Sequence, residues 1–129
     1  MMKVLIVEDD NEIGKMLERA FRLSGYETTL LLDGESAIEY LRSVDELPSA
    51  IIMDVIMPKM SGIDLLRTIK EENNLKNIPI MVLTNSFLKE NAEQFISLGA
   101  DMYLVKIEHK ANEIVDKIKH LIDNKVISK

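Results

Sequence analysis

The chain has 129 residues, which is the usual size of a single domain and long enough to bury a hydrophobic core without disulfides or a structural metal. It has 47% hydrophobic and 29% charged residues, a composition typical of globular rather than disordered proteins. The absence of cysteine excludes a disulfide framework and a thiolate zinc site, and the net charge of -6 argues against direct binding to nucleic acid.

No part of the sequence has the pattern of a membrane segment or a secretion signal. The uninterrupted apolar runs reach only four to six residues, and the N-terminal segment becomes acidic directly after Val7. We therefore expect a cytoplasmic protein without membrane insertion, in which residues 1–129 form one domain.

The first predicted strand is VLIV at residues 4–7, and a segment with the period of an amphipathic helix follows it. Gly25 is a helix stop signal, and the mixed polarity of residues 26–32 suits an edge strand. Asp33 is then the predicted N-cap of a second helix. The first of these helices should bury Ile13, Met16, Leu17, Ala20 and Phe21, and the second Ala37, Ile38, Leu41 and Val44.

The third predicted strand is AIIMD at residues 50–54, and its apolar run predicts a central, buried position. Ser61 and Asp64 have the spacing of a capping box at the start of the next helix. That helix should bury Leu65, Leu66 and Ile69.

The fourth predicted strand covers residues 78–84, and the helix after it ends at Gly99. The fifth strand covers residues 102–106. Five strand-helix units in strict alternation predict an α/β fold with a parallel sheet and helices on both faces. The last two helices should bury Leu88, Ala92, Phe95 and Ile96, and Ile114, Val115, Ile118, Leu121 and Ile122.

Four of the predicted strands end at polar residues, and in a parallel sheet these ends lie along the edge where open α/β sheets bind ligands. Carboxylates that lie close together repel one another, and a single lysine balances only part of their charge. Oxygen ligands without a nearby His or Cys suit Mg²⁺, or Mn²⁺ in its place. The residues are Glu8, Asp9 and Asp10 after the first strand, Asp54 on the third, Thr84 on the fourth and Lys106 on the fifth.

This combination predicts a site for phosphoryl transfer, because Mg²⁺ commonly shares its ligands with phosphate oxygens. Asp54 is the candidate covalent acceptor of the phosphoryl group. Asp9 would hold the metal directly, with Glu8 or Asp10 assisting through water. Each residue alone has an ordinary structural explanation, such as a helix cap, but four strand ends together favour a shared site.

The other two polar strand ends would act on the phosphoryl oxygens. Lys106 would offset their negative charge, and the Thr84 hydroxyl would donate a hydrogen bond to one of them. A solvated lysine and a threonine that only fills a strand are the structural alternatives for these two residues.

Four motifs carry a resemblance to a known family, and they cover the chain from Lys3 to about Asp123: VLIVEDD, IIMDVIMPKMSG, MVLTN and GADMYLVK. In this order they resemble the receiver domain of bacterial two-component response regulators. The resemblance implies a doubly wound, flavodoxin-like (βα)5 fold with five parallel strands in the order 2-1-3-4-5.

The resemblance also implies roles for individual residues. Asp54 would accept a phosphoryl group from a histidine kinase, and Mg²⁺ would be bound by Glu8, Asp9, Asp54 and the backbone carbonyl of Ile56. A switch is implied as well, in which Thr84 is drawn toward the phosphoryl group and the aromatic residue of the last strand turns inward. That aromatic residue is Tyr103.

Tyr103 could also be a core tyrosine with a satisfied hydroxyl.

Two positions differ from the family pattern. Ile107 replaces a proline that follows the lysine with a cis peptide, and that feature is not carried over because a cis bond before a non-proline residue costs about 2.5 to 4 kcal/mol. Asn85 replaces a small residue and would hinder or alter the inward turn of Tyr103.

The resemblance also bears on the lifetime of the phosphoryl group. In receivers, the residues at the positions of Ile56 and Ser86 line the route of the water that hydrolyses the aspartyl phosphate. Since the Ile56 side chain cannot hydrogen-bond that water, we expect slow to moderate self-dephosphorylation.

Other classes of protein share part of this pattern. A phosphohydrolase of the haloacid dehalogenase class needs a second acid where this chain has Ile56, and a flavodoxin needs a phosphate loop where residues 8–11 are acidic. A degenerate receiver would lack one of the acids, the threonine or the lysine, and none is missing. That reading and a phosphorelay intermediate remain the alternatives to a simple response regulator.

We expect a stand-alone regulator without an output domain, because only NKVISK follows Asp123. It would be no enzyme beyond Mg-dependent self-phosphorylation and self-dephosphorylation. The expected partners are a sensor histidine kinase or phosphotransfer protein and a downstream protein that contacts the fourth helix, fifth strand and fifth helix. Monomer and weak homodimer both stay open, and His109 and His120 are expected to be exposed rather than catalytic.

Overall fold

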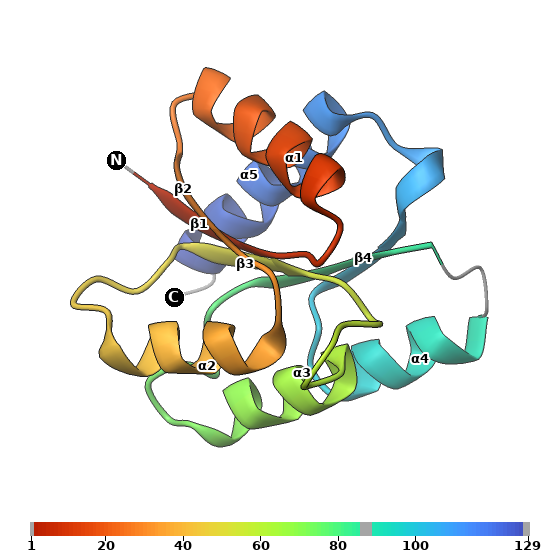
Figure 1. The fold of residues 1–129 in the computed structure, drawn as a ribbon. Helices are drawn as coiled ribbons and strands as arrows, with labels where there is room; N and C mark the ends of the chain where they lie inside the picture. Colours follow the sequence, from red (N-terminus) through yellow and green to blue (C-terminus); the bar gives the residue numbers. More distant parts are fainter. Residues whose placement is uncertain (1, 86–88, 128–129) are drawn as a thin grey trace.

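The computed structural model describes residues 2–85 and 89–127 (Figure 1). Its strands are β1 (Lys3–Val7), β2 (Glu27–Leu31), β3 (Ala50–Met53), β4 (Ile80–Thr84) and β5 (Met102–Val105). Its helices are α1 (Asn11–Leu23), α2 (Gly34–Ser43), α3 (Gly62–Glu71), α4 (Lys89–Ser97), α5 (Ala111–Ile127) and the 3-10 helix η1 (Lys106–Glu108). Across these described residues, none of the helices has both the length and the apolar character that crossing a membrane requires.

The five strands form one parallel sheet in the order β2-β1-β3-β4-β5, which confirms the predicted doubly wound α/β fold. The register brings the strand ends level with one another, since Val7 pairs with Met53 and Thr84 pairs with Val105. Residues that directly follow the strands therefore lie along one edge of the sheet.

Helices cover both faces of the sheet (Figure 1). The side chains of the strands alternate between two cores, one on each face. Helices α1 and α5 cover one face, where Phe21 and Ile118 are fully buried. Helices α2, α3 and α4 cover the other face, where Leu41, Leu66 and Phe95 fill the core. The apolar side chains of β1, β3 and β4 are buried on both faces, which explains their continuous apolar runs.

Two predicted helix caps form as expected. The Asp33 carboxylate accepts a hydrogen bond from the backbone N–H of Ser36 at 2.8 Å, and the Ser61 hydroxyl accepts one from the N–H of Asp64 at 3.3 Å. The bond from Ser36 holds the pKa of Asp33 below its usual value. The stability that this cap contributes is therefore present at neutral pH and is lost as the pH falls through the lowered pKa.

Two residues predicted to be buried are exposed instead. Met16 of α1 has 52% of its surface exposed, and Ile96 of α4 has 47%. Met16 is next to the fully buried Leu17, and Ile96 is next to the fully buried Phe95. Adjacent residues of a helix point in directions about 100° apart, so the neighbour of a buried residue can face solvent. Leu88, predicted for the stripe of α4, lies outside the described residues.

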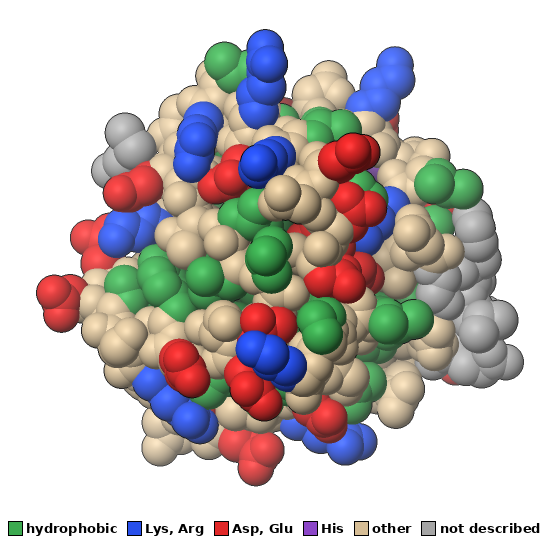
Figure 2. Space-filling model, in the orientation of Figure 1, with side chains coloured by type: hydrophobic (Ala, Val, Ile, Leu, Met, Phe, Trp, Pro, Cys, Tyr) green, Lys and Arg blue, Asp and Glu red, His purple; other side chains and the backbone are tan. Residues whose placement is uncertain are grey.

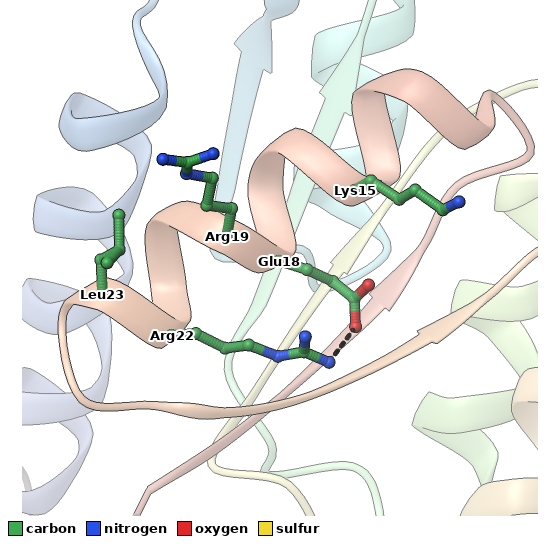
Figure 3. A pocket seen from close by; sticks show the side chains of 5 residues that line it. All are labelled: Lys15, Glu18, Arg19, Arg22 and Leu23. Atoms are coloured by element: carbon green, nitrogen blue, oxygen red, sulfur yellow. Dashed lines mark hydrogen bonds and ion pairs between the residues drawn. The ribbon is translucent and has the colours of Figure 1, made fainter.

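A groove of about 450 Å³ runs along the outer side of α1 (Figure 3). The Glu18 carboxylate in this groove pairs with Arg22 at 3.0 Å and accepts a hydrogen bond from the Thr28 hydroxyl of β2 at 3.1 Å. These contacts link α1 to the edge strand. The lining residues are Lys15, Glu18, Arg19, Arg22 and Leu23, and none of them follows the carboxyl end of a strand.

Candidate functional site

Three carboxylates meet at the carboxyl ends of β1 and β3. Glu8 and Asp9 follow β1, Asp54 follows β3, and one oxygen of each lies within 4.8 Å of the others. The backbone pairing continues past the strands, because the N–H of Asp54 donates to the Val7 carbonyl at 3.2 Å and that of Glu8 to the Leu31 carbonyl at 3.0 Å. Figure 2 shows acidic side chains gathered on this face.

Lys106 contacts two of the three acids. Its ammonium group donates a hydrogen bond to Oδ2 of Asp54 at 3.0 Å and forms an ion pair with Glu8. Burial opposes the charge on Lys106, but its hydrogen bonds to Glu8 and Asp54 outweigh this effect and raise the pKa of the lysine. The fifth strand ends at Val105, one residue earlier than predicted, so Lys106 opens η1 and still reaches the site.

Glu8 is a carboxylate in a buried position. It is 3% exposed, and its Oε2 accepts a hydrogen bond from the N–H of Asp10 at 3.1 Å. Burial is the largest effect on this group and raises the pKa of Glu8 to about 6, against the lowering effects of Lys106 and Asp10. Repulsion from Asp54 acts in the same direction as burial. The pKa of Glu8 is therefore raised although the lysine favours its ionised form.

The donor set of this cluster fits a hard divalent cation. All three donors are carboxylate oxygens, and the exposed Asp9 leaves the cluster open to water, which Mg²⁺ usually retains in its ligand shell. Asp10, predicted as a possible assisting ligand, instead caps α1 by accepting hydrogen bonds from the N–H groups of Glu12 at 3.0 Å and Ile13 at 3.2 Å. Of the two residues predicted to assist, Glu8 is the one that lies in the cluster.

A pocket of about 320 Å³ opens beside Asp54, and its other lining residues are Ile56, Thr84 and Asn85. Thr84 ends β4 and is 3% exposed, whereas the Ile56 side chain is 79% exposed. The Asp54 carboxylate is held on two sides, since Oδ1 accepts from the N–H of Val55 at 2.7 Å while Oδ2 contacts the lysine. Ser86 lies outside the described residues.

Tyr103 lies in β5 on the side of the sheet covered by α4. Its ring packs against Phe95, with ring centroids 5.8 Å apart and planes tilted by 45°. Its hydroxyl oxygen is buried and has no hydrogen-bond partner within the part of the chain that the structure describes. Among the described residues, nothing satisfies the Tyr103 hydroxyl in the way that the core-tyrosine alternative requires.

The chain matches the family described as response regulator receiver domain over residues 4–119. It belongs to this family. Response regulators are the receiving components of two-component signalling, so this assignment confirms the resemblance seen in the sequence motifs.

Relatives and solved structures agree with the assignment. The transcriptional regulatory protein PrrA of Mycobacterium tuberculosis is 36% identical over 121 residues, which are 93% of this chain and 49% of that protein. The chain thus spans about half the length of the transcriptional regulators it matches. The chemotaxis response regulator CheY4 of Vibrio cholerae has a TM-score of 0.85 at 27% identity, covering 94% of this chain and 98% of that one.

A second solved structure bears on the site. The receiver domain of the sensor histidine kinase PA1611 from Pseudomonas aeruginosa PAO1 has a TM-score of 0.84 at 29% identity, covering 95% of this chain and 98% of that chain. That structure has a magnesium ion coordinated in its active site cleft.

This receiver domain departs from sequence expectation at His109. Its side chain is only 19% exposed, and Nδ1 is buried 3.9 Å from a carboxylate oxygen of Glu113, whereas His120 is exposed as expected. His109 lines a cavity of about 190 Å³ that also involves Met16 and Ile107. His109 and residues of η1 line this cavity together with Ile13 and Leu17 of α1, a tertiary arrangement for which the sequence carries no signal. The peptide bond between Lys106 and Ile107 is trans.

Divalent-cation binding should weaken as the pH falls below about 6, because Glu8 then takes up a proton and loses its charge. The stability of the metal-free fold depends on pH in the opposite direction. Because the pKa of Glu8 is higher in the folded protein than its ordinary value of 4.5, protonation of Glu8 stabilises the fold at pH values below 4.5, and this stabilisation is lost as the pH rises through about 6. Titration with Mn²⁺, followed by the electron paramagnetic resonance of the free ion on both sides of this pH, measures the affinity.

Glu8→Gln is the matched control for this titration. It should bind Mn²⁺ more weakly than the wild type and lose the affinity step near pH 6. A wild-type affinity that does not change across this range would contradict the assignment of Glu8 as a ligand.

Tyr103→Phe should raise the free energy of unfolding by about 1 kcal/mol, because it removes a buried hydroxyl that has no partner in residues 2–85 and 89–127. Urea unfolding followed by circular dichroism measures the change. Tyr40→Phe is the control, since the Tyr40 hydroxyl lies 3.4 Å from the Thr29 hydroxyl, and its loss should not stabilise the protein. Equal stability of Tyr103→Phe and the wild type would show that the hydroxyl finds a partner in solution.

Proposed function

We propose that this receiver domain accepts a phosphoryl group on Asp54 from the phosphohistidine of a sensor kinase or a phosphotransfer protein, with Mg²⁺ as cofactor. One observation carries the proposal: Asp54 lies within reach of both a cation-binding pair of acids, Glu8 and Asp9, and a buried lysine. An aspartate that served only as a helix cap, a surface acid or a partner in a structural ion pair would not need both kinds of neighbour, the acid pair and the lysine.

The transfer exchanges one bond to phosphorus for another. An Asp54 oxygen forms the new O–P bond as the N–P bond of the phosphohistidine breaks, and the departing imidazole nitrogen takes up a proton. The Val55 N–H and the Lys106 ammonium already hold one oxygen of the acceptor each, which limits its rotation. Lys106 and the Thr84 hydroxyl then interact with the phosphoryl oxygens.

The proposed metal ligands are the side chains of Glu8, Asp9 and Asp54 and, as the family resemblance implies, the carbonyl of Ile56. Bound Mg²⁺ would neutralise charge that develops on the transferred phosphoryl group. The pKa of about 6 for Glu8 means that this residue is mostly ionised, and able to bind the cation, at neutral pH.

We propose a regulator rather than an enzyme that acts on external phosphoesters. The position two residues after the acceptor is where a phosphohydrolase of this chemistry needs a general acid, and Ile56 offers none. Its side chain is 79% exposed at the mouth of the pocket and cannot move a proton.

Exposed apolar side chains around the acceptor support docking of the phosphoryl donor at this edge. Ile56, Ile107 and Met16 are 79%, 75% and 52% exposed. The last two line the cavity beside α1, Ile56 lines the acceptor pocket, and Asn85 lines both, so the two hollows adjoin. An apolar rim around a charged centre favours a partner that buries the rim and excludes water during transfer.

The output of phosphorylation is proposed to be protein contact. The buried Tyr103 hydroxyl gains nothing from its present position, which supports a second position for this side chain when Thr84 engages the phosphoryl group. The surface affected would be that of α4, β5 and α5, and a downstream protein would bind the phosphorylated form. The net charge of -6 favours a protein partner over nucleic acid.

Acetyl phosphate with Mg²⁺ should add one phosphoryl group to the wild type and none to Asp54→Asn, because the amide cannot form the acyl phosphate. Intact mass spectrometry measures the modification. Asp45→Asn, which changes an exposed acid in the loop after α2, should be labelled like the wild type, and removal of Mg²⁺ should prevent labelling. A wild type that stays unmodified would favour the degenerate receiver, which binds partners without phosphorylation.

Ile56→Asn should shorten the lifetime of the phosphorylated protein, because an amide at the mouth of the pocket can hydrogen-bond the attacking water and the isoleucine cannot. The decay of the phosphoprotein, followed by intact mass after removal of the donor, measures the rate. Ile56→Leu keeps an apolar side chain and should decay like the wild type. An unchanged rate in Ile56→Asn would contradict the role given to this side chain.

A further inference from the structure

The segment from residue 55 to 61 joins β3 to α3 and carries Ile56, yet no helix or strand holds it. The N–H of Met60 donates to the Pro58 carbonyl at 2.8 Å, which closes a three-residue turn around Lys59. Lys59 has a φ of 69°, an uncommon conformation for a residue with a side chain. A segment with this backbone keeps its shape only if its surroundings fix it.

On one side, the segment lies directly against the start of α3. The N–H of Gly62 donates to the Val55 carbonyl at 2.8 Å, and a Cβ added at Gly62 would lie 2.9 Å from the Cα of Val55 and closer still to the carbonyl oxygen of Asp54. Glycine thus allows the first turn of α3 to approach the backbone of the acceptor itself.

On the other side, the segment lies against the start of α2. A Cβ added at Gly34 would lie 2.8 Å from the Cβ of Met60 and 3.1 Å from both its Cγ and its carbonyl oxygen. The neighbouring residues add a second contact, since the ammonium group of Lys59 lies 4.0 Å from a carboxylate oxygen of Asp33. The two ends of this contact, Met60 and Gly34, belong to elements far apart in the sequence.

The backbone of Gly34 does not itself require glycine. Its φ lies outside the left-handed region, unlike that of Gly25 or Gly99, and it is the first residue of an ordinary helix. The missing side chain is therefore explained by the space that Met60 occupies. The atoms in the way are the Cβ and the backbone carbonyl, so a side chain at this position moves the backbone of the segment rather than a flexible tip.

We propose that Gly34 is a positioning residue for the phosphoacceptor site: it lets Met60 seat against α2 and so holds the segment 55–61, with the Ile56 carbonyl, in place beside Asp54. The inference rests on the proposed function for the identity of that site. It assigns to α2, which contributes no side chain to the acidic cluster, a part in metal binding and phosphorylation.

Gly34→Ala tests this role. The added methyl group should displace Met60 and weaken Mn²⁺ binding on the order of tenfold, which is typical for loss of a group that orients a metal ligand. Labelling by acetyl phosphate should slow in parallel. Mn²⁺ affinity from electron paramagnetic resonance is the primary readout, because it reports on the site without any phosphoryl chemistry.

Gly25→Ala is the control for a purely structural effect. Gly25 has a φ of 92° at the opposite edge of the sheet, and a Cβ there would meet no atom within 4 Å, so alanine strains the backbone without touching the site. It should lower the melting temperature and leave Mn²⁺ affinity unchanged. The two alanine variants therefore separate loss of stability from loss of positioning.

A double-mutant cycle with Met60→Gly tests the contact itself. In the double variant, the methyl group meets neither the Cβ nor the Cγ of Met60, so Mn²⁺ affinity should exceed the value expected from the two single losses combined. The double variant also answers the case in which Gly34→Ala does not fold, because it should fold and bind Mn²⁺.

Two results would overturn the proposal: wild-type Mn²⁺ affinity in Gly34→Ala, or strictly additive losses in the cycle. A wild type that binds Mn²⁺ but takes up no phosphoryl group would contradict the proposed function instead, and the affinities would still decide the role of Gly34.

Discussion

Repulsion among the three carboxylates of Glu8, Asp9 and Asp54 is the constraint on which the site depends. The fold forces these groups to within 4.8 Å of one another and offers Lys106 as the compensating cation in the cluster. Burial, with a smaller contribution from the charge of Asp54, raises the pKa of Glu8 to about 6 despite the lysine. A fold that tolerates this arrangement keeps a site ready for added positive charge, and a divalent cation supplies it.

The parallel sheet brings the three acids close together and also fixes the backbone positions from which their side chains extend. Strand β3 is buried on both faces, so its position is set by packing against two layers of helices, and Asp54 stands where that burial ends. Backbone pairing with β1 continues to Asp54, since its N–H donates to the Val7 carbonyl. The backbone positions of the acids are therefore fixed by the core, and groups on strand ends are held more precisely than groups on free loops.

Much of the fold and of the acidic site could be predicted from the sequence, because residues that follow the strands of a parallel sheet all lie at the same edge of the sheet. Alternating elements predict the sheet, and polar residues at strand ends then converge, as Asp54 and Lys106 do. Features set by tertiary contact could not be predicted. The partial burial of His109 depends on the cavity that its segment lines together with α1, and the contact of Met60 with Gly34 joins two elements whose sequences carry no sign of each other.

Ile56 shows how one position can serve opposite requirements of the site. Its backbone belongs to the segment that α2 and α3 hold beside Asp54, while its side chain points to solvent and is 79% exposed. In the proposed site the carbonyl is a metal ligand and has to be held rigidly, whereas the exposed side chain can vary without disturbing the core. In the proposed function, the Ile56 side chain therefore controls the access of water and the contact with the donor, while the backbone carbonyl holds the metal.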